Sequence, residues 1–137
     1  MKKIKLLPHT ADVGIEVEAD SFQELFAGAL LGMNEILKKG YCQNANTFPI
    51  SHEITLESVD QIALLIDFLN LVLAYSNEKK ALFCRVEFQG LNERFLKAEI
   101  FGEKVDSFEE DIKAATYHGA EIIKKGEKYE VQILFDI

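Results

Sequence analysis

The sequence is poor in the residues that build linkers, disulfide frameworks and zinc sites. It has only two prolines, so no proline-rich linker divides its 137 residues, a length that suits one domain with a real core. Its two cysteines, Cys42 and Cys84, lie far apart and lack the Cys-x-x-Cys spacing of a metal or redox motif. We expect two reduced thiols, one or both buried; a single disulfide is the alternative.

Tryptophan and long apolar runs are also missing. Ten phenylalanines and no tryptophan predict a core of Phe, Leu and Ile. The longest unbroken apolar runs, Ile62–Ile66 and Leu71–Tyr75, are far too short to span a bilayer. The N-terminus has no long apolar segment of the signal-peptide type. We therefore expect a cytoplasmic protein that does not enter a membrane.

Basic residues are in the minority. The chain has 15 Lys and Arg against 23 Asp and Glu, which gives a formal net charge of −8. A sequence-independent grip on nucleic-acid phosphates requires a basic face. The charge balance therefore disfavours strong direct binding of nucleic acid. It favours a basic protein partner, a cation, or simple solubility.

The familiar signatures of catalysis are absent. The sequence has no Gly-rich phosphate loop, no G-x-S-x-G nucleophile elbow and no H-E-x-x-H zinc helix. No two of its histidines, His9, His52 and His118, share the spacing of metal ligands, so a structural role is favoured for each. Nothing in these patterns predicts a self-sufficient enzyme.

Two segments have the apolar spacing that is typical of helices. The first is Phe22–Leu37, and Ser21 with Glu24 forms a capping-box signal at its start. The second begins after Asp60 and ends at Ser76–Asn77. Its apolar residues cover more than one face, so we expect it to be buried on several sides.

The remaining segments predict strands, turns and one ambiguous stretch. Residues Tyr41–Ser51 are typical of a loop, Gly90–Asn92 and Lys124–Glu127 of turns, and Ile112–Ile123 fits either a helix or a strand. We expect an α+β single domain in which a mixed or antiparallel sheet packs on two long helices, with strand, capped helix and strand in both halves. The predicted strands are Met1–Leu7, Ile15–Ala19, His52–Ser58, Leu82–Phe88, Phe95–Phe101 and Tyr129–Phe135.

Polar residues gather in the loop that precedes the strand at Ile15–Ala19. His9, Thr10 and Asp12 fall within four residues there. Loops that lead into buried strands commonly carry site residues. The alternative is that Thr10 and Asp12 only hydrogen-bond their own backbone in a turn.

The last strand ends in carboxylates. Asp136 contributes a side chain and Ile137 the free main-chain carboxylate. If Asp12 lay beside them, three hard oxygen donors would converge, which suits Mg²⁺, Ca²⁺ or Mn²⁺ better than Zn²⁺. Nothing in the sequence brings residue 12 near residue 136, and the alternative is a solvated charge at a strand end.

A cation, a phenol and an imidazole are combined in the segment Lys113–His118. If this segment is a strand, Lys113 and Tyr117 share one face, and Thr116 and His118 share the other. The alternative is a solvated lysine and a half-buried tyrosine.

Four stretches together resemble the archease family. They are HTADVGIEVEADSFQELFAGAL at 9–30, DFLN at 67–70, IKAATYHGAEI at 112–122 and VQILFDI at 131–137, and they span almost the whole chain in the family's order and spacing. The resemblance implies a single archease-like domain over residues 1–137, with a compact α+β fold built from a duplicated βαβ-type unit.

The resemblance also implies a function. Archeases are accessory proteins of the RtcB-type RNA ligase, which joins a 2′,3′-cyclic phosphate or 3′-phosphate RNA end to a 5′-hydroxyl in tRNA splicing and RNA repair. The ligase works through a GMP–histidine intermediate made with GTP and Mn²⁺. The chain is then expected to promote guanylylation of the ligase, and so multiple turnover, without being an enzyme itself. It would encounter GTP only through the ligase.

The family's site residues map onto this sequence. Its metal ligands correspond to Asp12, Asp136 and Ile137, which implies a bound divalent cation, Ca²⁺, Mg²⁺ or Mn²⁺. Lys113 corresponds to a lysine that matters for ligase activation, and His9 and His118 stand in the same motifs. Two other functions are open: a metal-independent, chaperone-like module that binds an RNA-processing or modifying enzyme, and a small hydrolase that uses Asp12 with His9 or His118.

Overall fold

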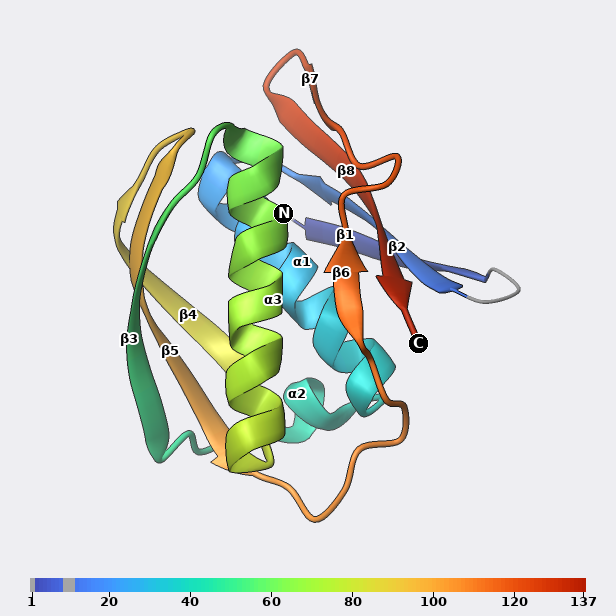
Figure 1. Cartoon of the computed structure of the whole chain (residues 1–137), viewed down its shortest axis with the longest axis vertical. Helices are drawn as coiled ribbons and strands as arrows, with labels where there is room; N and C mark the ends of the chain where they lie inside the picture. The colour runs from blue at the N-terminus through green and yellow to red at the C-terminus, as the bar shows by residue number, and fades with distance from the viewer. Residues whose placement is uncertain (1, 9–11) are drawn as a thin grey trace.

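Two antiparallel sheets enclose two long helices. In the computed structural model, which describes residues 2–8 and 12–137, helices α1 and α3 lie between a five-stranded and a three-stranded sheet (Figure 1). The elements are β1 (Lys2–Pro8), β2 (Asp12–Ala19), α1 (Phe22–Leu37), α2 (Tyr41–Asn44), β3 (Ile50–Glu57), α3 (Gln61–Lys79), β4 (Ala81–Leu91), β5 (Phe95–Lys104), β6 (Ala114–Thr116), β7 (Ile122–Lys125) and β8 (Lys128–Asp136).

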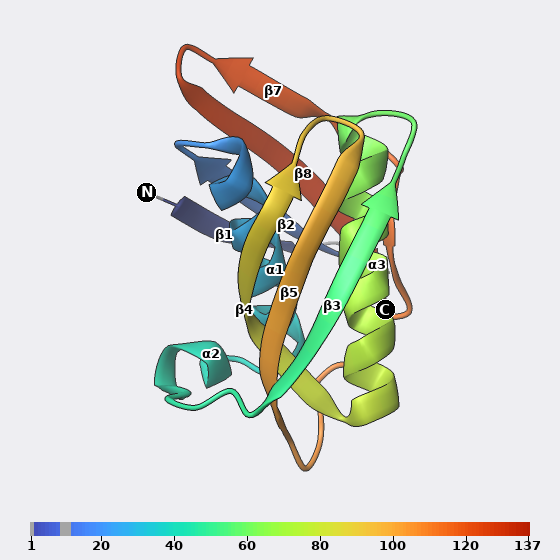
Figure 2. The ribbon, with the colours of Figure 1, turned by 90° about the vertical axis from the view of Figure 1, so that its left-hand side faces the viewer.

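The strands form two separate sheets. In the five-stranded sheet the order is β1-β2-β8-β6, and β7 also pairs with β8; in the three-stranded sheet it is β3-β5-β4, side by side in Figure 2. Every pairing is antiparallel. A strand precedes and a strand follows each long helix, as β2-α1-β3 and β3-α3-β4. The prediction of a single α+β domain with two long helices is confirmed, and its strands are divided between two sheets.

Helix α1 begins and packs as its sequence predicts. The Ser21 hydroxyl accepts a hydrogen bond from the Glu24 N–H at 3.1 Å, which satisfies one of the free donors of the first turn. Gly28 and Gly32, four residues apart on one face, allow β2 to approach the helix closely. A Cβ at Gly28 would lie 2.7 Å from Cγ1 of Val17, and one at Gly32 would lie 2.8 Å from Cδ1 of Ile15.

We expect Gly28→Ala to destabilise the protein despite the higher helix propensity of alanine. Overpacking costs about 1–3 kcal/mol, and the propensity gain offsets about 1 kcal/mol of it, so the free energy of unfolding in urea should fall by about 1 kcal/mol. Gly90→Ala is the control, because its Cβ would meet nothing closer than 3.5 Å. An unchanged or higher stability of Gly28→Ala would show that β2 and α1 have room to separate.

Helix α3 is buried on several sides, as predicted. The Asp60 side chain accepts from the Ala63 N–H at 2.8 Å and caps its start, and eight of its residues are buried. The predicted end at Ser76–Asn77 is wrong, because Ser76 is fully buried and the helix continues to Lys79. Lys80, with a φ of 49°, then closes the helix by donating its N–H to the Ser76 carbonyl oxygen.

The prediction of two reduced thiols is wrong: Cys42 and Cys84 form a disulfide, with their Cα atoms 5.5 Å apart. The segment predicted as a loop, Tyr41–Ser51, contains the short helix α2 and the start of β3. The bond therefore joins α2 to β4 across 42 positions of sequence. Such a pairing depends on how the chain folds back, which cysteine spacing does not reveal.

Tyr41 attaches the same segment to β5. Its hydroxyl and that of Thr47 both donate to the Glu103 carboxylate. Partial burial, and after it the hydrogen bond to Glu103, raises the pKa of Tyr41 to about 12. The folded chain thus holds this proton more tightly than the unfolded chain, where the pKa of tyrosine is about 10.

This difference predicts a loss of stability in alkali. The contribution of Tyr41 is fully present below about pH 10 and is lost as the pH rises through its folded pKa of about 12. We expect the free energy of unfolding of Tyr41→Phe, measured in urea at pH 9, 10 and 11, to fall less steeply than that of the wild type. Parallel curves for the two proteins would show that Tyr41 does not contribute.

Strand pairing defines the structure of the segment that fitted either a helix or a strand, and of the two predicted turns. Ile112–Ile123 contains no helix: Ala114–Thr116 forms β6, and β7 begins at Ile122. Strand β4 continues through the predicted turn to Leu91, and the Asn92 carboxamide oxygen then accepts from the N–H groups of Arg94 and Phe95 at 2.9 Å. Gly126, with a φ of 62°, makes the predicted turn before β8.

The core consists largely of leucine, isoleucine and phenylalanine, as the composition predicts. Phe26, Phe68, Phe83 and Phe135 are all fully buried. Across residues 2–8 and 12–137, no helix is both long and apolar enough to cross a membrane.

Candidate functional site at the end of the five-stranded sheet

Strand pairing places Asp12 directly opposite Asp136. Asp12 is the first residue of β2 and Asp136 the last of β8, and the two strands run antiparallel (Figure 1). Directly paired residues project their side chains from the same face of a sheet, with Cβ atoms about 4.5–5.5 Å apart. The proximity of Asp12 and Asp136, which could not be predicted from the sequence, therefore follows from the register of β2 and β8.

Both aspartates lie on the outer face of the sheet. In β8 the side chains of Val131, Ile133 and Phe135 are buried, so the alternate residue Asp136 faces outward, where it is exposed. Asp12 is half-buried. Two carboxylates that face each other repel, so this pair favours binding of a cation.

The other carboxylates on this face have partners. Glu16 accepts from the Gln132 side chain at 3.1 Å, Glu18 pairs with Lys128 at 3.2 Å, and Glu130 pairs with Lys125 at 3.3 Å. Among the residues that the structure describes, neither Asp12 nor Asp136 has such a side-chain partner. In the part of the chain that the structure describes, the carboxylates at the end of the strands therefore differ from the others on this face in having no side-chain partner.

Strand β6 reaches the same end of the sheet. Ala114 is paired with Asp136, and the Lys113 N–H donates to the Asp136 carbonyl oxygen at 2.7 Å. The Lys113 side chain is exposed. We refer to Asp12, Lys113, Asp136 and Ile137 as the strand-end site. It combines two opposed carboxylates with a lysine that immediately precedes β6 and is bonded through its main chain to Asp136.

Ile137 contributes differently. Its side chain is half-buried and packs against the hydrophobic core. This packing fixes the position of the residue that the family resemblance assigns as a third ligand.

Two polar residues of α3 attach the β6 segment to the helix. Asn70 exchanges two hydrogen bonds with the backbone of Ala115, and the Tyr117 hydroxyl donates to Asp67. The hydrogen bond to Asp67 is the largest cause that raises the pKa of Tyr117 above its usual value. The sequence-based search for site residues missed both contacts. The available signal was the pair Asp67 and Asn70, three residues apart in the otherwise apolar stretch 62–75 of the helix.

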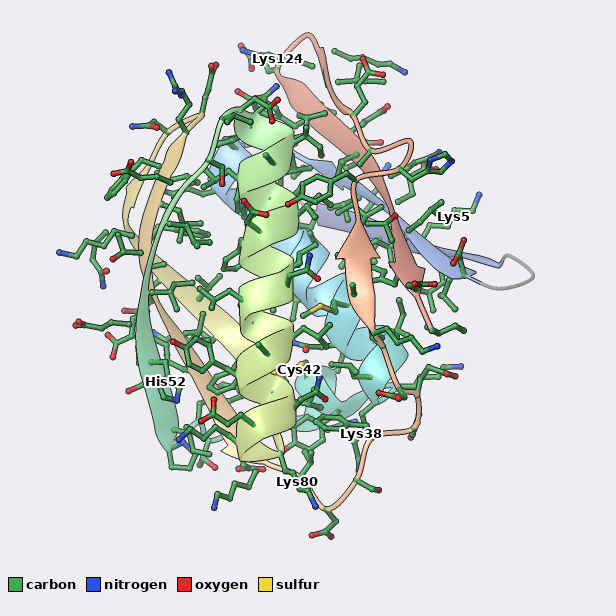
Figure 3. All side chains as sticks on the ribbon, viewed as in Figure 1. Lys5, Lys38, Cys42, His52, Lys80 and Lys124 are labelled. Atoms are coloured by element: carbon green, nitrogen blue, oxygen red, sulfur yellow. A yellow bond between two sulfur atoms is a disulfide. The ribbon has the colours of Figure 1, made fainter. Side chains whose placement is uncertain are left out.

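The two histidines that the structure describes, His52 and His118, lie on different parts of the fold. His118 lies in an exposed turn after β6, and His9, like Thr10, lies outside the described residues. His52, labelled in Figure 3, is on β3 of the other sheet, where its ring stacks on Tyr75 with centroids 4.5 Å apart. Its position is structural.

The donor set at the strand-end site suits a hard cation. Over residues 2–8 and 12–137 the structure contains no group of three or more His, Cys, Asp or Glu side chains that could hold a metal ion. Asp12 and Asp136 supply two side-chain carboxylates. Both are oxygen donors, which fits Ca²⁺, Mg²⁺ or Mn²⁺ and leaves other positions for water or for a partner's groups.

A separate apolar hollow of about 490 Å³ lies between β1, α1 and α2. Ile4 and Leu6 line it from β1, and Leu31 and Cys42 from the helical side. None of the residues of the strand-end site lines it.

Comparisons with known proteins agree in sequence and in fold. The sequence profile of the archease protein family (MTH1598/TM1083) matches residues 5–137. The chain is 29% identical to the protein archease of Methanosarcina barkeri, over 99% of this chain and 97% of that protein. It is also 29% identical to the protein archease of Pyrococcus abyssi, over the full length of both.

Two solved structures have the same fold. The solution structure of protein 1598 of Methanobacterium thermoautotrophicum superimposes with a TM-score of 0.75 at 22% identity, over 98% of both chains. The crystal structure of an archease and possible chaperone from Thermotoga maritima gives a TM-score of 0.69 at 22% identity, over 97% of this chain and 96% of that one. The profile match over nearly the whole chain establishes that the protein belongs to the archease family.

Proposed function

We propose that this chain is a cytoplasmic accessory factor of an RtcB-type RNA ligase, which promotes guanylylation of the ligase and its multiple turnover in tRNA splicing and RNA repair. Membership of the archease family supports the proposal. The single structural observation that carries it is the direct opposition of Asp12 and Asp136 at one end of the five-stranded sheet, beside Lys113.

In this proposal Asp12, Asp136 and the carboxylate at Ile137 hold a divalent cation. A cation bound there would have open positions that could coordinate phosphate oxygens of the nucleotide at the ligase active site. Asp12 and Asp136 lie on the paired strands β2 and β8, and Ile137 directly follows β8. This ladder holds the donors in fixed relative positions.

The chain's own groups position and stabilise charge. Lys113, exposed next to Asp136, engages a phosphate or an acidic group of the ligase. The ligase histidine, and not this chain, forms the covalent bond to GMP. Orientation and preorganised charge are major contributions to nucleotidyl and phosphoryl transfer. A small protein that docks at the ligase active site can therefore accelerate the reaction without supplying a nucleophile.

The test is guanylylation with labelled GTP and limiting ligase from the same organism, with and without this protein. We expect the protein to increase both the rate of labelling and the number of RNA ligation turnovers. If the wild-type protein changes neither, the proposed activation is wrong. If it stimulates equally with the strand-end carboxylates removed, the metal-independent binding module is the correct function.

A further inference from the structure

Asn70 binds both backbone groups of one residue on a neighbouring strand. It is half-buried on α3, where its Nδ2 donates to the Ala115 carbonyl oxygen at 3.0 Å and its Oδ1 accepts from the Ala115 N–H at 2.8 Å. Ala115 is buried in the middle of β6, the three-residue strand at the edge of the sheet. The carboxamide thus satisfies a donor and an acceptor that would otherwise be costly to bury.

Asp67 supports this attachment from the preceding turn of α3. Its Oδ1 accepts from the Tyr117 hydroxyl, and its Oδ2 accepts from the Ser58 hydroxyl at 2.7 Å. Residues three apart on a helix project in similar directions, so Asp67 and Asn70 face the same neighbour. Together they attach the β6 segment to the helix at two points.

The attached segment carries Lys113. Strand β6 forms only three pairs with β8, and irregular chain precedes and follows it. A strand of this length has few ladder hydrogen bonds, so its contacts with α3 contribute a large share of its stability. Lys113 lies two residues before Ala115, and its N–H donates to the Asp136 carbonyl oxygen. Loss of the attachment at Ala115 should therefore loosen the chain at Lys113.

We infer that Asn70 is a positioning residue: by fixing β6 against α3, its carboxamide holds the chain at Lys113, whose N–H is bonded to the Asp136 carbonyl oxygen, at the end of the sheet. This inference rests on the function proposed above. Asn70 acts through Lys113, because its own polar atoms are occupied by the backbone of Ala115.

Asn70→Ala removes both hydrogen bonds, whereas Asn70→Asp keeps the acceptor for the Ala115 N–H and loses the donor. We expect Asn70→Ala to lower the maximal stimulation of ligase guanylylation on the order of tenfold, because misplacing a group by about 1 Å costs up to about 100-fold. Asn70→Asp should have an intermediate effect and remains informative if the alanine variant does not fold.

Asn34→Ala is the matched control. Asn34 is a buried asparagine on α1 whose Nδ2 donates to the Phe83 carbonyl oxygen at 2.9 Å, on the other sheet. Asn34→Ala removes the same kind of hydrogen bond, so it should destabilise the fold without moving β6. Its maximal stimulation should match that of the wild type at a temperature where both proteins are folded.

A double-mutant cycle separates positioning from general destabilisation. If Asn70 acts through Lys113, Asn70→Ala should have little further effect in a Lys113→Ala background. A multiplicative loss in the double variant would mean that Asn70 contributes to stability alone, and would overturn the inference.

Amide hydrogen exchange tests the positioning without the ligase. In Asn70→Ala the amides of Lys113 and Ala115 should exchange faster, while the Ile15 and Ile133 amides of the β2–β8 pair stay protected. Unchanged protection of Lys113 would refute the inference whatever the activity. Faster exchange of Lys113, together with a wild-type protein that fails to stimulate the ligase, would refute the proposed function and leave the attachment by Asn70 intact.

Discussion

Replacing Asp12 with Asn should reduce stimulation of ligase guanylylation on the order of 100-fold, a typical cost of removing one preorganised electrostatic group. The substitution preserves shape and removes one of the two opposed charges. Because directly opposed like charges destabilise a sheet, the metal-free variant should be slightly more stable than the wild type, by roughly 0.2–1 kcal/mol. Asp12→Asn should therefore lose function and gain stability at once.

Thermal unfolding with and without Ca²⁺ or Mn²⁺ tests the same substitution without the ligase. A cation that binds only the folded chain raises the melting temperature of the wild type. The shift should be lost in Asp12→Asn and in Asp136→Asn. The control is Glu16→Gln, a charge removed from the same face of β2 at a position that is bonded to Gln132. Wild-type stimulation by Asp12→Asn would exclude the strand-end site as the source of activation.

Reduction of the Cys42–Cys84 disulfide should lower the free energy of unfolding by about 4 kcal/mol, the chain-entropy expectation for a loop of this length. The bond joins residues separated by 42 positions, so it restricts a large part of the unfolded chain. Urea unfolding with and without dithiothreitol measures the effect. A variant with both cysteines replaced by alanine should be insensitive to the reductant.

The strand-end site should survive this change. Its residues lie on β2, on β8 and next to β6, whereas the disulfide joins α2 to β4. Reduced protein that is still folded should therefore stimulate guanylylation as the oxidised protein does. Two reactive thiols found in non-reduced, denatured protein would show that the bond does not form.

Local chemistry made the helices predictable. Ser21 and Asp60 cap α1 and α3 because their side chains reach the N–H groups of the first turn, a signal confined to a few residues. The alternation of apolar residues likewise located β2 and β8. The end of α3 was misplaced because Ser76, a residue typical of helix ends, is buried by tertiary packing.

Contacts between distant residues were not predictable in this way. The opposition of Asp12 and Asp136 depends on β8 pairing with β2, and the Cys42–Cys84 bond depends on α2 folding back onto β4. Family resemblance predicted the residues of the strand-end site, but it did not predict that Asp12 and Asp136 are paired. The attachment of β6 by Asn70 could not be predicted from the sequence either, because an asparagine in a helix has many possible partners.

The central position of β8 has a consequence for the order in which the protein folds. β8 follows all the other described strands in the sequence, yet it lies between β2 and the strands β6 and β7. Until residues 128–136 emerge from the ribosome, β2 can pair only with β1, and its other edge stays open to water or to a chaperone. Contacts between such distant segments slow folding. We therefore expect the five-stranded sheet to close only after β8 has been synthesised, and the pairing of Asp12 with Asp136 to form late in folding.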